Sequence, residues 1–381
     1  MLSISFKLAK SNLIYRKERT ILTLFSISLS IFISFLLLSI IDGFLKTISN
    51  SLNLKNIDIV ITSGDLPLEL GPIVVSTTSY KININIYQEI RQKYPNLIVS
   101  PIFKDLIKIN EKLVPLISMD LEYMGKFYPQ NNVIITTNEP INEPIVLIGK
   151  ELSKILNLKE NDILKIKGND YKIYKVLDKF NGYEDYSIFM DYRDYIKLFN
   201  INYLSQLWVI TNSPESNKII SDLKNEYPNL FFYNIQEANN SQYSIIAILK
   251  AIQVVIIVAS VSTALVASTN TILITTFERI KEFAIILAIG SPRAIVFLTV
   301  LLEGIIISTI GSIIGITLGI ISSLLFQNSF HKALNLSIPI VSISTTVFYQ
   351  ILIITCLIGV LSSILPAYIA YTINLHESIR K

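Results

Sequence analysis

Four long runs without a charged residue constrain what this chain can fold into. They extend over 20–41, 251–277, 304–330 and 333–373. A helix needs about 20 mostly apolar residues to cross the hydrocarbon of a bilayer, and each run is long enough. Only 16% of the 381 residues are charged, which is too few for an ordinary soluble protein. We therefore predict an α-helical membrane protein with four transmembrane helices, at 20–42, 246–276, 294–325 and 346–371.

The residues between the first and second runs are polar and carry charges of both signs. Short runs of β-forming residues alternate there with short helical patterns, which is typical of an α+β domain. We therefore predict one α+β domain inserted at 43–245. The remaining segments are predicted to be a flank at 1–19, a short helix and turn at 277–293, a loop at 326–345 and a tail at 372–381.

Basic residues lie unevenly beside the runs, and basic flanks stay on the cytoplasmic side of a membrane. One side carries Lys7, Lys10, Arg16, Lys17, Arg19, Arg279, Lys281, Arg293, Arg380 and Lys381. The short loop on the opposite side carries Lys332 alone. We therefore predict that both termini are cytoplasmic and that the inserted domain is extracytoplasmic.

The first run could instead be a cleaved signal peptide. It is longer than the apolar core of about 7–15 residues that signal peptides have, and no small-residue cleavage site follows it. An uncleaved membrane anchor is therefore favoured.

Turn and stop signals give the elements of the inserted domain. A hairpin is predicted at Asn110-Glu111, and a strand, a helix from Lys150, a strand, a turn at 168–170 and another strand follow. The tetrapeptide Tyr-Pro-Asn-Leu occurs at 94–97 and 227–230. Because proline excludes its predecessor from a helix, each copy is predicted to end a helix and open a strand. The repeat reflects either two related halves or chance.

The motifs of common enzymes are absent from the sequence. There is no G-x-x-x-x-G-K-[ST] loop, no H-E-x-x-H and no G-x-S-x-G, and His331 and His376 are far apart. Cys356 is the one cysteine, so intrachain disulfides are excluded. The carboxylates Glu184 and Asp185 are interpreted as solvated turn charges. We predict a non-catalytic chain that binds no cofactor and no metal.

The loop between the second and third runs reads as a short helix. On a helix, Phe277, Ile280, Phe283, Ala284 and Leu287 share one side, while Glu278, Arg279, Lys281 and Glu282 share the other. Ile285, Ile286 and Ile289 fall on the charged side, so the second half has no face suited to water. Gly290 is predicted to end this helix, Ser291 to cap the next one and Pro292 to begin it. We infer that a cytoplasmic partner grips the loop.

Two features of the third run concern helix packing. Glu303 is predicted to be an acidic residue within the membrane, where a carboxylate is paired, hydrated or protonated. Its role is either in helix packing or in the transmission of conformational change. Gly311, Gly315 and Gly319 recur every four residues and predict a close helix contact, within the chain or across a dimer.

The segment "ERIKEFAIILAIGSPRAIV…LLEGIIISTIGSIIGITLG" resembles the core of the FtsX/MacB/LolCE family of ABC transporter permeases. The matching positions are Arg279, Glu282, Phe283, Ala284, Leu287, Ala288, Gly290, Ser291, Glu303 and Gly304. "VLIGKELSKILNLKENDILKIKG" is similar to the MacB-like periplasmic domain, and "LSIIDGFLKTI" is closest to the lipoprotein-releasing LolC/LolE branch. The end of the chain resembles the terminal signature of the family at Pro366, Ala367, Ala370 and Arg380.

The resemblance implies a permease subunit without a catalytic site, in the plasma (inner) membrane of a prokaryote. It implies pairing with a P-loop ATP-binding cassette subunit, which would hold ATP and Mg, and with a second permease chain in a homodimer or heterodimer. No nucleic acid is implied. The residues implied to couple to the ATPase are Glu278, Arg279, Glu282, Phe283, Ile285, Ile286, Leu287 and Gly290, with Gly304, Gly311, Gly315 and Gly319 in helix packing.

Three functions follow as hypotheses. The leading one is mechanotransmission, in which ATP hydrolysis moves the extracytoplasmic domain and extrudes or releases an amphipathic or lipid-linked substrate to an acceptor. The alternative is an FtsX-like regulator of an outside enzyme such as a cell-wall hydrolase. The third is a membrane-anchored binding domain without an ATPase.

Overall fold

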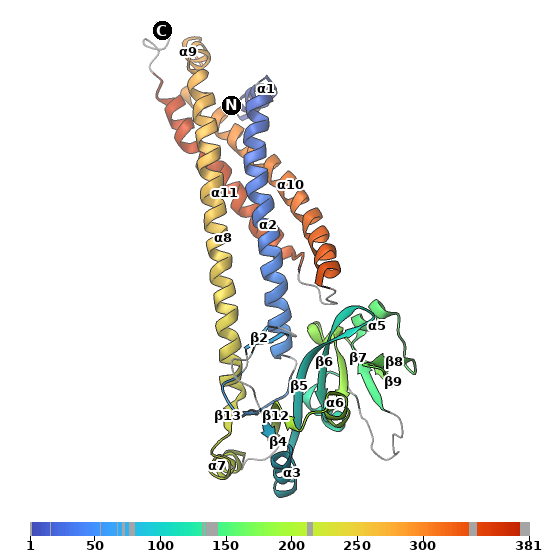
Figure 1. Ribbon diagram of the computed structural model, residues 1–381. Coiled ribbons are helices and arrows are strands. Elements are labelled where there is room, and N and C mark those ends of the chain that lie inside the picture. The colour runs from blue at the N-terminus through green and yellow to red at the C-terminus, as the bar shows by residue number, and fades with distance from the viewer. Residues whose placement is uncertain are drawn as a thin grey trace. The chain divides into compact units, whose positions relative to one another are not determined.

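The computed structural model describes residues 2–15, 17–53, 55–66, 68–70, 73–75, 81–131, 133, 144–211, 216–334 and 341–373 (Figure 1). It divides into two compact units, which are described separately. The helical unit comprises Met1–Gly43, Lys250–Gln327 and Val341–Lys381, and the inserted domain comprises Phe44–Leu249 and Asn328–Ile340. Arg380 and the rest of 374–381 lie outside the described residues, as does 335–340 of the predicted loop.

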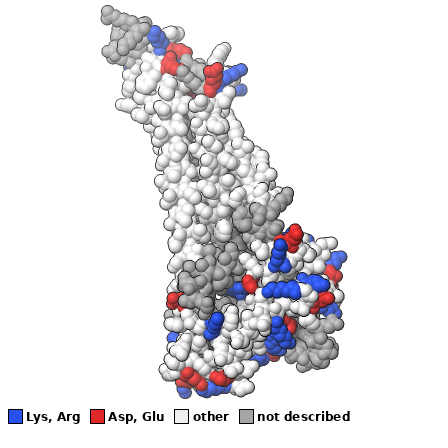
Figure 2. All heavy atoms as spheres, viewed as in Figure 1, with Lys and Arg blue, Asp and Glu red and all other residues white. Residues whose placement is uncertain are grey.

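Among the described residues, six helices lie wholly or partly in the helical unit. They are α1 (Leu2–Tyr15), α2 (Lys17–Asn53), α8 (Ile235–Glu278), α9 (Ile280–Ala288), α10 (Arg293–Leu334) and α11 (Thr345–Tyr371). In the described part of the chain, four are long and apolar enough to cross a membrane, within Thr20–Asn50, Tyr243–Glu278, Arg293–Ser329 and Thr345–Tyr371. The visible face of the helical unit is free of charge along its middle (Figure 2). The prediction of four apolar helices is confirmed.

The glycines of α10 bring this helix against α2. A Cβ atom added to Gly311 would lie 2.8 Å from Cγ2 of Ile27, and one added to Gly315 would lie 2.7 Å from the backbone oxygen of Ser28. Gly319 faces the ring of Phe35 in the same way. These contacts leave no room for a side chain, so the glycine stripe is a contact within the chain.

Gly304 makes a second close contact, with α11. A Cβ atom there would meet the side chain of Ser363 and lie 3.0 Å from the backbone oxygen of Gly359. Deeper in the unit, the hydroxyl of Ser268 on α8 donates to that of Ser362 on α11 at 3.0 Å. Close contacts at glycine and serine positions therefore join α2 to α10, α10 to α11 and α8 to α11.

The inserted domain is built on a mixed sheet of nine strands in the order β13-β1-β12-β5-β6-β10-β7-β9-β8. The strands are β1 (Ile59–Thr62), β5 (Leu97–Ile109), β6 (Lys112–Met119), β7 (Ile145–Ile148), β8 (Ile163–Ile166), β9 (Asn169–Val176), β10 (Ile188–Asp191), β12 (Gln206–Thr211) and β13 (Phe231–Asn234). The pairs β6–β10 and β7–β9 are parallel and the others antiparallel. Two small sheets pair β2 (Leu68–Leu70) with β3 (Ile73–Val75) and β4 (Ile82–Asn83) with β11 (Tyr203–Leu204).

Helices cover both faces of this sheet. One core packs against α3 (Ile84–Lys93), α5 (Lys150–Leu156), α6 (Tyr192–Phe199) and α7 (Ser216–Glu226). The other packs against η1 (Leu121–Tyr123), α4 (Met124–Phe127) and η2 (Tyr183–Tyr186). Along β12, Leu207 and Val209 belong to the first core, and Trp208 and Ile210 to the second. This alternation is what a strand buried on both faces requires.

The local signals in the inserted domain hold well. Asn110 and Glu111 both have positive φ and form the two-residue turn between β5 and β6, as predicted. Both Tyr-Pro-Asn-Leu copies follow a helix and precede a strand, so the two helix stops are confirmed. The predicted turn at 168–170 falls slightly earlier, at Lys167 and Gly168, which also have positive φ.

The interpretation of Glu184 and Asp185 as solvated turn charges is wrong, because both side chains are buried. Asp185 accepts hydrogen bonds from the backbone amides of Phe180 and Asn181, each at 2.7 Å. Glu184 lies 3.8 Å from the ammonium of Lys55. These buried carboxylates therefore stabilise the turn by their hydrogen bonds and their ion pair.

Candidate functional site

The junction between α8 and α9 is a one-residue break in an otherwise continuous helical path. Arg279 is the break residue, with φ −100° and ψ 6°. Its amide donates to the carbonyl of Thr276 at 3.1 Å, and its own carbonyl accepts from the amide of Phe283 at 2.9 Å. An isolated residue in this backbone region changes the direction of a helix.

The side chain of Arg279 turns inward and pairs with Glu303 of α10. Its Nη1 lies 2.6 Å from Oε1 and 2.9 Å from Oε2 of Glu303, and the two residues are 4% and 5% exposed. Asn12 of α1 donates from Nδ2 to Oε1 of Glu303 at 2.8 Å. The intramembrane acid predicted at Glu303 is therefore paired, and its carboxylate joins three elements that are distant in sequence.

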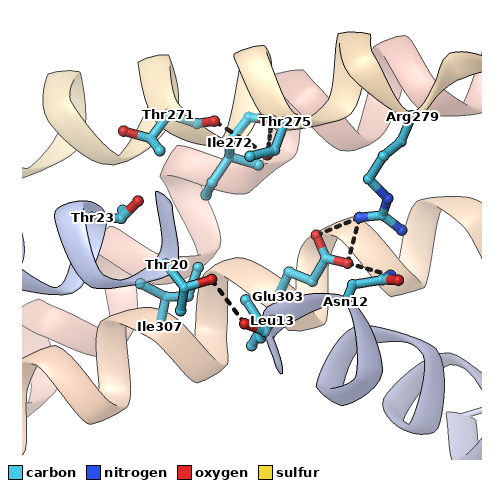
Figure 3. A pocket seen from close by; sticks show the side chains of 10 residues that line it. All are labelled: Asn12, Leu13, Thr20, Thr23, Thr271, Ile272, Thr275, Arg279, Glu303 and Ile307. Atoms are coloured by element: carbon cyan, nitrogen blue, oxygen red, sulfur yellow. Dashed lines mark hydrogen bonds and ion pairs between the residues drawn. The ribbon is translucent and has the colours of Figure 1, made fainter. Parts of the chain in front are cut away.

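A cavity of ≈ 30 Å³ borders this ion pair (Figure 3). It is lined by Asn12, Leu13, Thr20, Thr23, Thr271, Ile272, Thr275, Arg279, Glu303 and Ile307. A water molecule needs about 10–15 Å³ of such space, so the cavity has room for one or two. The threonine hydroxyls of 20 and 271 donate to backbone carbonyls and keep their oxygens as acceptors.

The inner side of α9 packs onto the helices of its own chain. Phe283, Ala284 and Leu287 are buried in one cluster with residues of α8, α10 and α11, and Ile286 is partly buried beside them. The expectation that Arg279 lies on the exposed, charged side is therefore wrong. Its charge is buried because Glu303, which comes from another helix, supplies the compensating partner.

The outer side of α9 mixes charged and apolar residues. Ile285 is 56% exposed and Ile289 is 81% exposed, and Lys281 and Glu282 lie exposed beside them. Glu278, at the end of α8, is exposed as well. Of the three apolar residues at 285–287 that the sequence assigns to a partner, Ile285 is exposed, Ile286 is partly buried and Leu287 is buried.

Gly290 fixes where α9 ends. Its φ is +97°, a conformation that strongly favours glycine. Its amide donates to the carbonyl of Leu287 at 3.1 Å, and the amide of Ser291 donates to that of Ile286 at 3.3 Å. These two bonds form a Schellman motif, which confirms the predicted helix stop. α10 begins at Arg293, one residue after the predicted start.

No pattern noted in the sequence placed α1 in the site. Ser5 and Ala9 bury one side of this helix, and the hydroxyl of Ser5 donates to the carbonyl of Ile295 on α10 at 3.3 Å. The spacing of Ser5, Ala9 and Asn12, small or polar residues on one helical face, is the signal that could have revealed it.

Four helices long and apolar enough to cross a membrane, a short helix that ends sharply and a large inserted α+β domain define a polytopic membrane protein. Residues 20–226, more than half of the chain, match the family described as MacB-like periplasmic core domain. Residues 254–375 match the FtsX-like permease C-terminal family. The chain belongs to the FtsX/MacB type of ABC transporter permeases.

A relative and two solved structures accompany these matches. An uncharacterised ABC transporter permease of Methanocaldococcus jannaschii is 24% identical over 234 residues, which are 58% of this chain and 58% of that protein. The periplasmic region of MacB from Actinobacillus actinomycetemcomitans is 11% identical with a TM-score of 0.37, covering 48% of this chain and 91% of its own. The extracellular domain of the noncanonic ABC-type transporter YknZ from Gram-positive bacteria is 14% identical with a TM-score of 0.33, covering 47% and 99%. At these scores, neither structure alone establishes a shared fold.

Proposed function

We propose that the chain is the non-catalytic permease subunit of an ATP-driven machine. We further propose that α9 is its handle, meaning the element that a partner ATPase binds and moves. A P-loop ATPase subunit, holding ATP and Mg, grips the outer side of α9, and a second permease chain completes the assembly. The membrane is the plasma (inner) membrane of a prokaryote, with both termini and α9 cytoplasmic. Basic residues beside α1 and α9 support this orientation.

The exposed face of α9 is the observation that carries the proposal. A short helix that leaves Ile285 and Ile289 exposed between charged residues has the composition of a surface that another protein covers. Its inner side packs against α8, α10 and α11, and the ion pair of Arg279 with Glu303 ties the start of α9 to α10, so a force on α9 would reach these helices.

We further propose that the motion is delivered to the inserted domain rather than to a channel. Among the described residues, the cavity beside Glu303 and the one between α2, α8 and α11 measure ≈ 30 Å³ each, which is space for a few water molecules. α2 and α8 each begin in one unit and end in the other. We propose that the substrate is an amphipathic or lipid-linked molecule released at the outer leaflet, as in the LolC/LolE branch that the sequence resembles.

Co-purification tests the handle. The chain, extracted in mild detergent from its host, is expected to carry a P-loop ATPase. Ile285→Glu should reduce recovery of that ATPase at least about tenfold, because burying an unpaired carboxylate in an interface costs several kcal/mol. Ile163→Glu is the matched control, since Ile163 is an exposed isoleucine of the inserted domain, at 68% against 56% for Ile285. Equal recovery from wild type and Ile285→Glu would refute the role of α9.

Reconstitution tests the output. Proteoliposomes with the whole complex should release an acylated protein on addition of ATP and Mg. Retention of the acylated protein, together with ATP-dependent activation of an outside cell-wall hydrolase, would instead identify an FtsX-like regulator.

A further inference from the structure

The carboxylate of Glu303 is the meeting point of three segments. The guanidinium of Arg279 reaches it from the break between α8 and α9, and the amide of Asn12 reaches it from α1. Hydrogen bonds to a charged group are short and directional, and these three lie between 2.6 and 2.9 Å. The relative positions of α1, α9 and α10 are therefore fixed here by geometry.

The other contacts of α9 do not fix its position in the same way. Phe283, Ala284 and Leu287 touch their neighbours through apolar surfaces, which are not directional. The backbone between α8 and α9 is interrupted at Arg279, so bending at this residue breaks no regular run of helix hydrogen bonds. Without its ion pair, Arg279 would be a hinge.

The surroundings of Arg279 also permit a second position. Its Nε lies 3.4 Å from Oε2 of Glu282, whose side chain is exposed, and its guanidinium lies over the ring of Phe283 at 4.4 Å. The ≈ 30 Å³ cavity lies beside the pair with Glu303. Arg279 thus stands between a buried carboxylate and an exposed one, with space to move.

We propose that Arg279, Glu303 and Asn12 form a polar latch that locks this hinge. This inference rests on the proposed function of α9 as a handle. With the latch closed, a push on α9 moves α8 and α10 as one body. With the latch open, α9 swings about Arg279 and the push is lost. Arg279 and Glu303 are positioning residues, since they transmit a force and touch no substrate.

Two probes on the assembled complex test the latch. In a Cys356→Ser background, a spin label is placed at Ala288→Cys on α9 or at Asn169→Cys on the inserted domain, both exposed positions. In the wild-type complex, ATP with vanadate should change both spectra. In Glu303→Gln, the change at Ala288 should persist, while that at Asn169 should shrink about fivefold or more, the lower range of coupling between sites.

Further variants separate the latch from general packing. Arg279→Gln should behave as Glu303→Gln does, and the double variant should be no worse than either, because the same contact is removed. Ser362→Ala is the matched control, since it removes a buried hydrogen bond between α8 and α11 away from the hinge. That variant should keep both responses.

Each outcome decides the matter. A full response at Asn169 in Glu303→Gln overturns the latch and leaves the proposed function intact. If Glu303→Gln does not assemble, the double variant Arg279→Gln with Glu303→Gln decides, because it removes the ion pair and leaves no buried charge without its partner. A reduced Asn169 response then supports the latch and a full one overturns it. A wild-type complex in which ATP changes neither spectrum contradicts the proposed function and the latch with it.

Discussion

Asp120, at the end of β6, shows how burial and charge compete at a single residue. Its side chain is 0% exposed, accepts from the hydroxyl of Tyr87 at 3.1 Å and lies 3.2 Å from Arg91 and 3.8 Å from Arg193. Burial raises the pKa of Asp120 above its ordinary value, and the nearby charge of Asp191 raises it further, against the two arginines. The network ties α3, η1 and α6 to one carboxylate.

This balance predicts a pH effect on stability. A carboxyl whose folded-state pKa is raised binds more protons in the folded than in the unfolded state, so stability falls as pH rises from about 4 through the raised pKa. Asp120→Asn imitates the protonated form and removes the contribution of this carboxyl to the pH dependence of stability. The variant should therefore gain stability relative to wild type as pH rises from 4 to 7.

Unfolding of the full chain, followed by the fluorescence of Trp208, measures this effect. Trp208 is the single tryptophan and is buried in the inserted domain. Asp170→Asn, at an exposed strand position, controls for the loss of a charge. A variant that instead loses stability relative to wild type as pH rises would mean that Arg91 and Arg193 outweigh burial.

Individual charges are where sequence reasoning failed. Glu184, Asp185 and Arg279 each lie in a polar stretch of sequence. Such a stretch predicts exposed charges only when no other group of the protein pairs with them. The partners are Lys55, the amides of 180 and 181, and Glu303. The amides of 180 and 181 lie within five residues of Asp185, but Lys55 and Glu303 come close only in the tertiary structure, so no local pattern could have predicted those two contacts.

At the scale of elements, the glycine stripe of α10 predicts the cost of separating two helices. Gly315→Leu would place its side chain against the backbone oxygen of Ser28 and the side chain of Ile31. Overpacking of this kind costs about 1–3 kcal/mol, so the detergent-solubilised chain should unfold several degrees lower.

Thr317→Leu is the control, because Thr317 is exposed on the same helix and has space for a larger side chain. Thermal unfolding of both variants measures the difference. Equal unfolding temperatures would show that α2 and α10 can separate at no cost, contrary to the contacts at Gly315.

Elements with strong local signals could be predicted, and weakly marked ones could not. The turn at Asn110, the helix stops before Pro95 and Pro228 and the left-handed end at Gly290 each follow from one residue's backbone preference. α1 carries no such signal. Ser5 and Asn12 join it to α10, and their partners there lie about 290 residues away in sequence.

At the scale of the whole molecule, the apolar runs predicted the number of spans but not the full lengths of the helices. α8 continues from Ile235 to Glu278, well beyond what a bilayer requires. Hydropathy marks only the apolar part of a helix. It therefore does not predict that α2 and α8 continue as helices, through polar turns, into the residues of the inserted domain.

The orientation of the chain gives the last prediction. If basic flanks set the topology, the exposed Asn169 and Lys281 lie on opposite sides of the membrane. In a Cys356→Ser background, Asn169→Cys should react with an impermeant thiol reagent on intact spheroplasts, and Lys281→Cys only after the membrane is opened. Because both positions are exposed in the folded chain, a difference in labelling reports the side of the membrane and not burial. Labelling of Lys281→Cys on intact spheroplasts, with Asn169→Cys protected, would invert the topology and place α9 beyond the reach of a cytoplasmic ATPase.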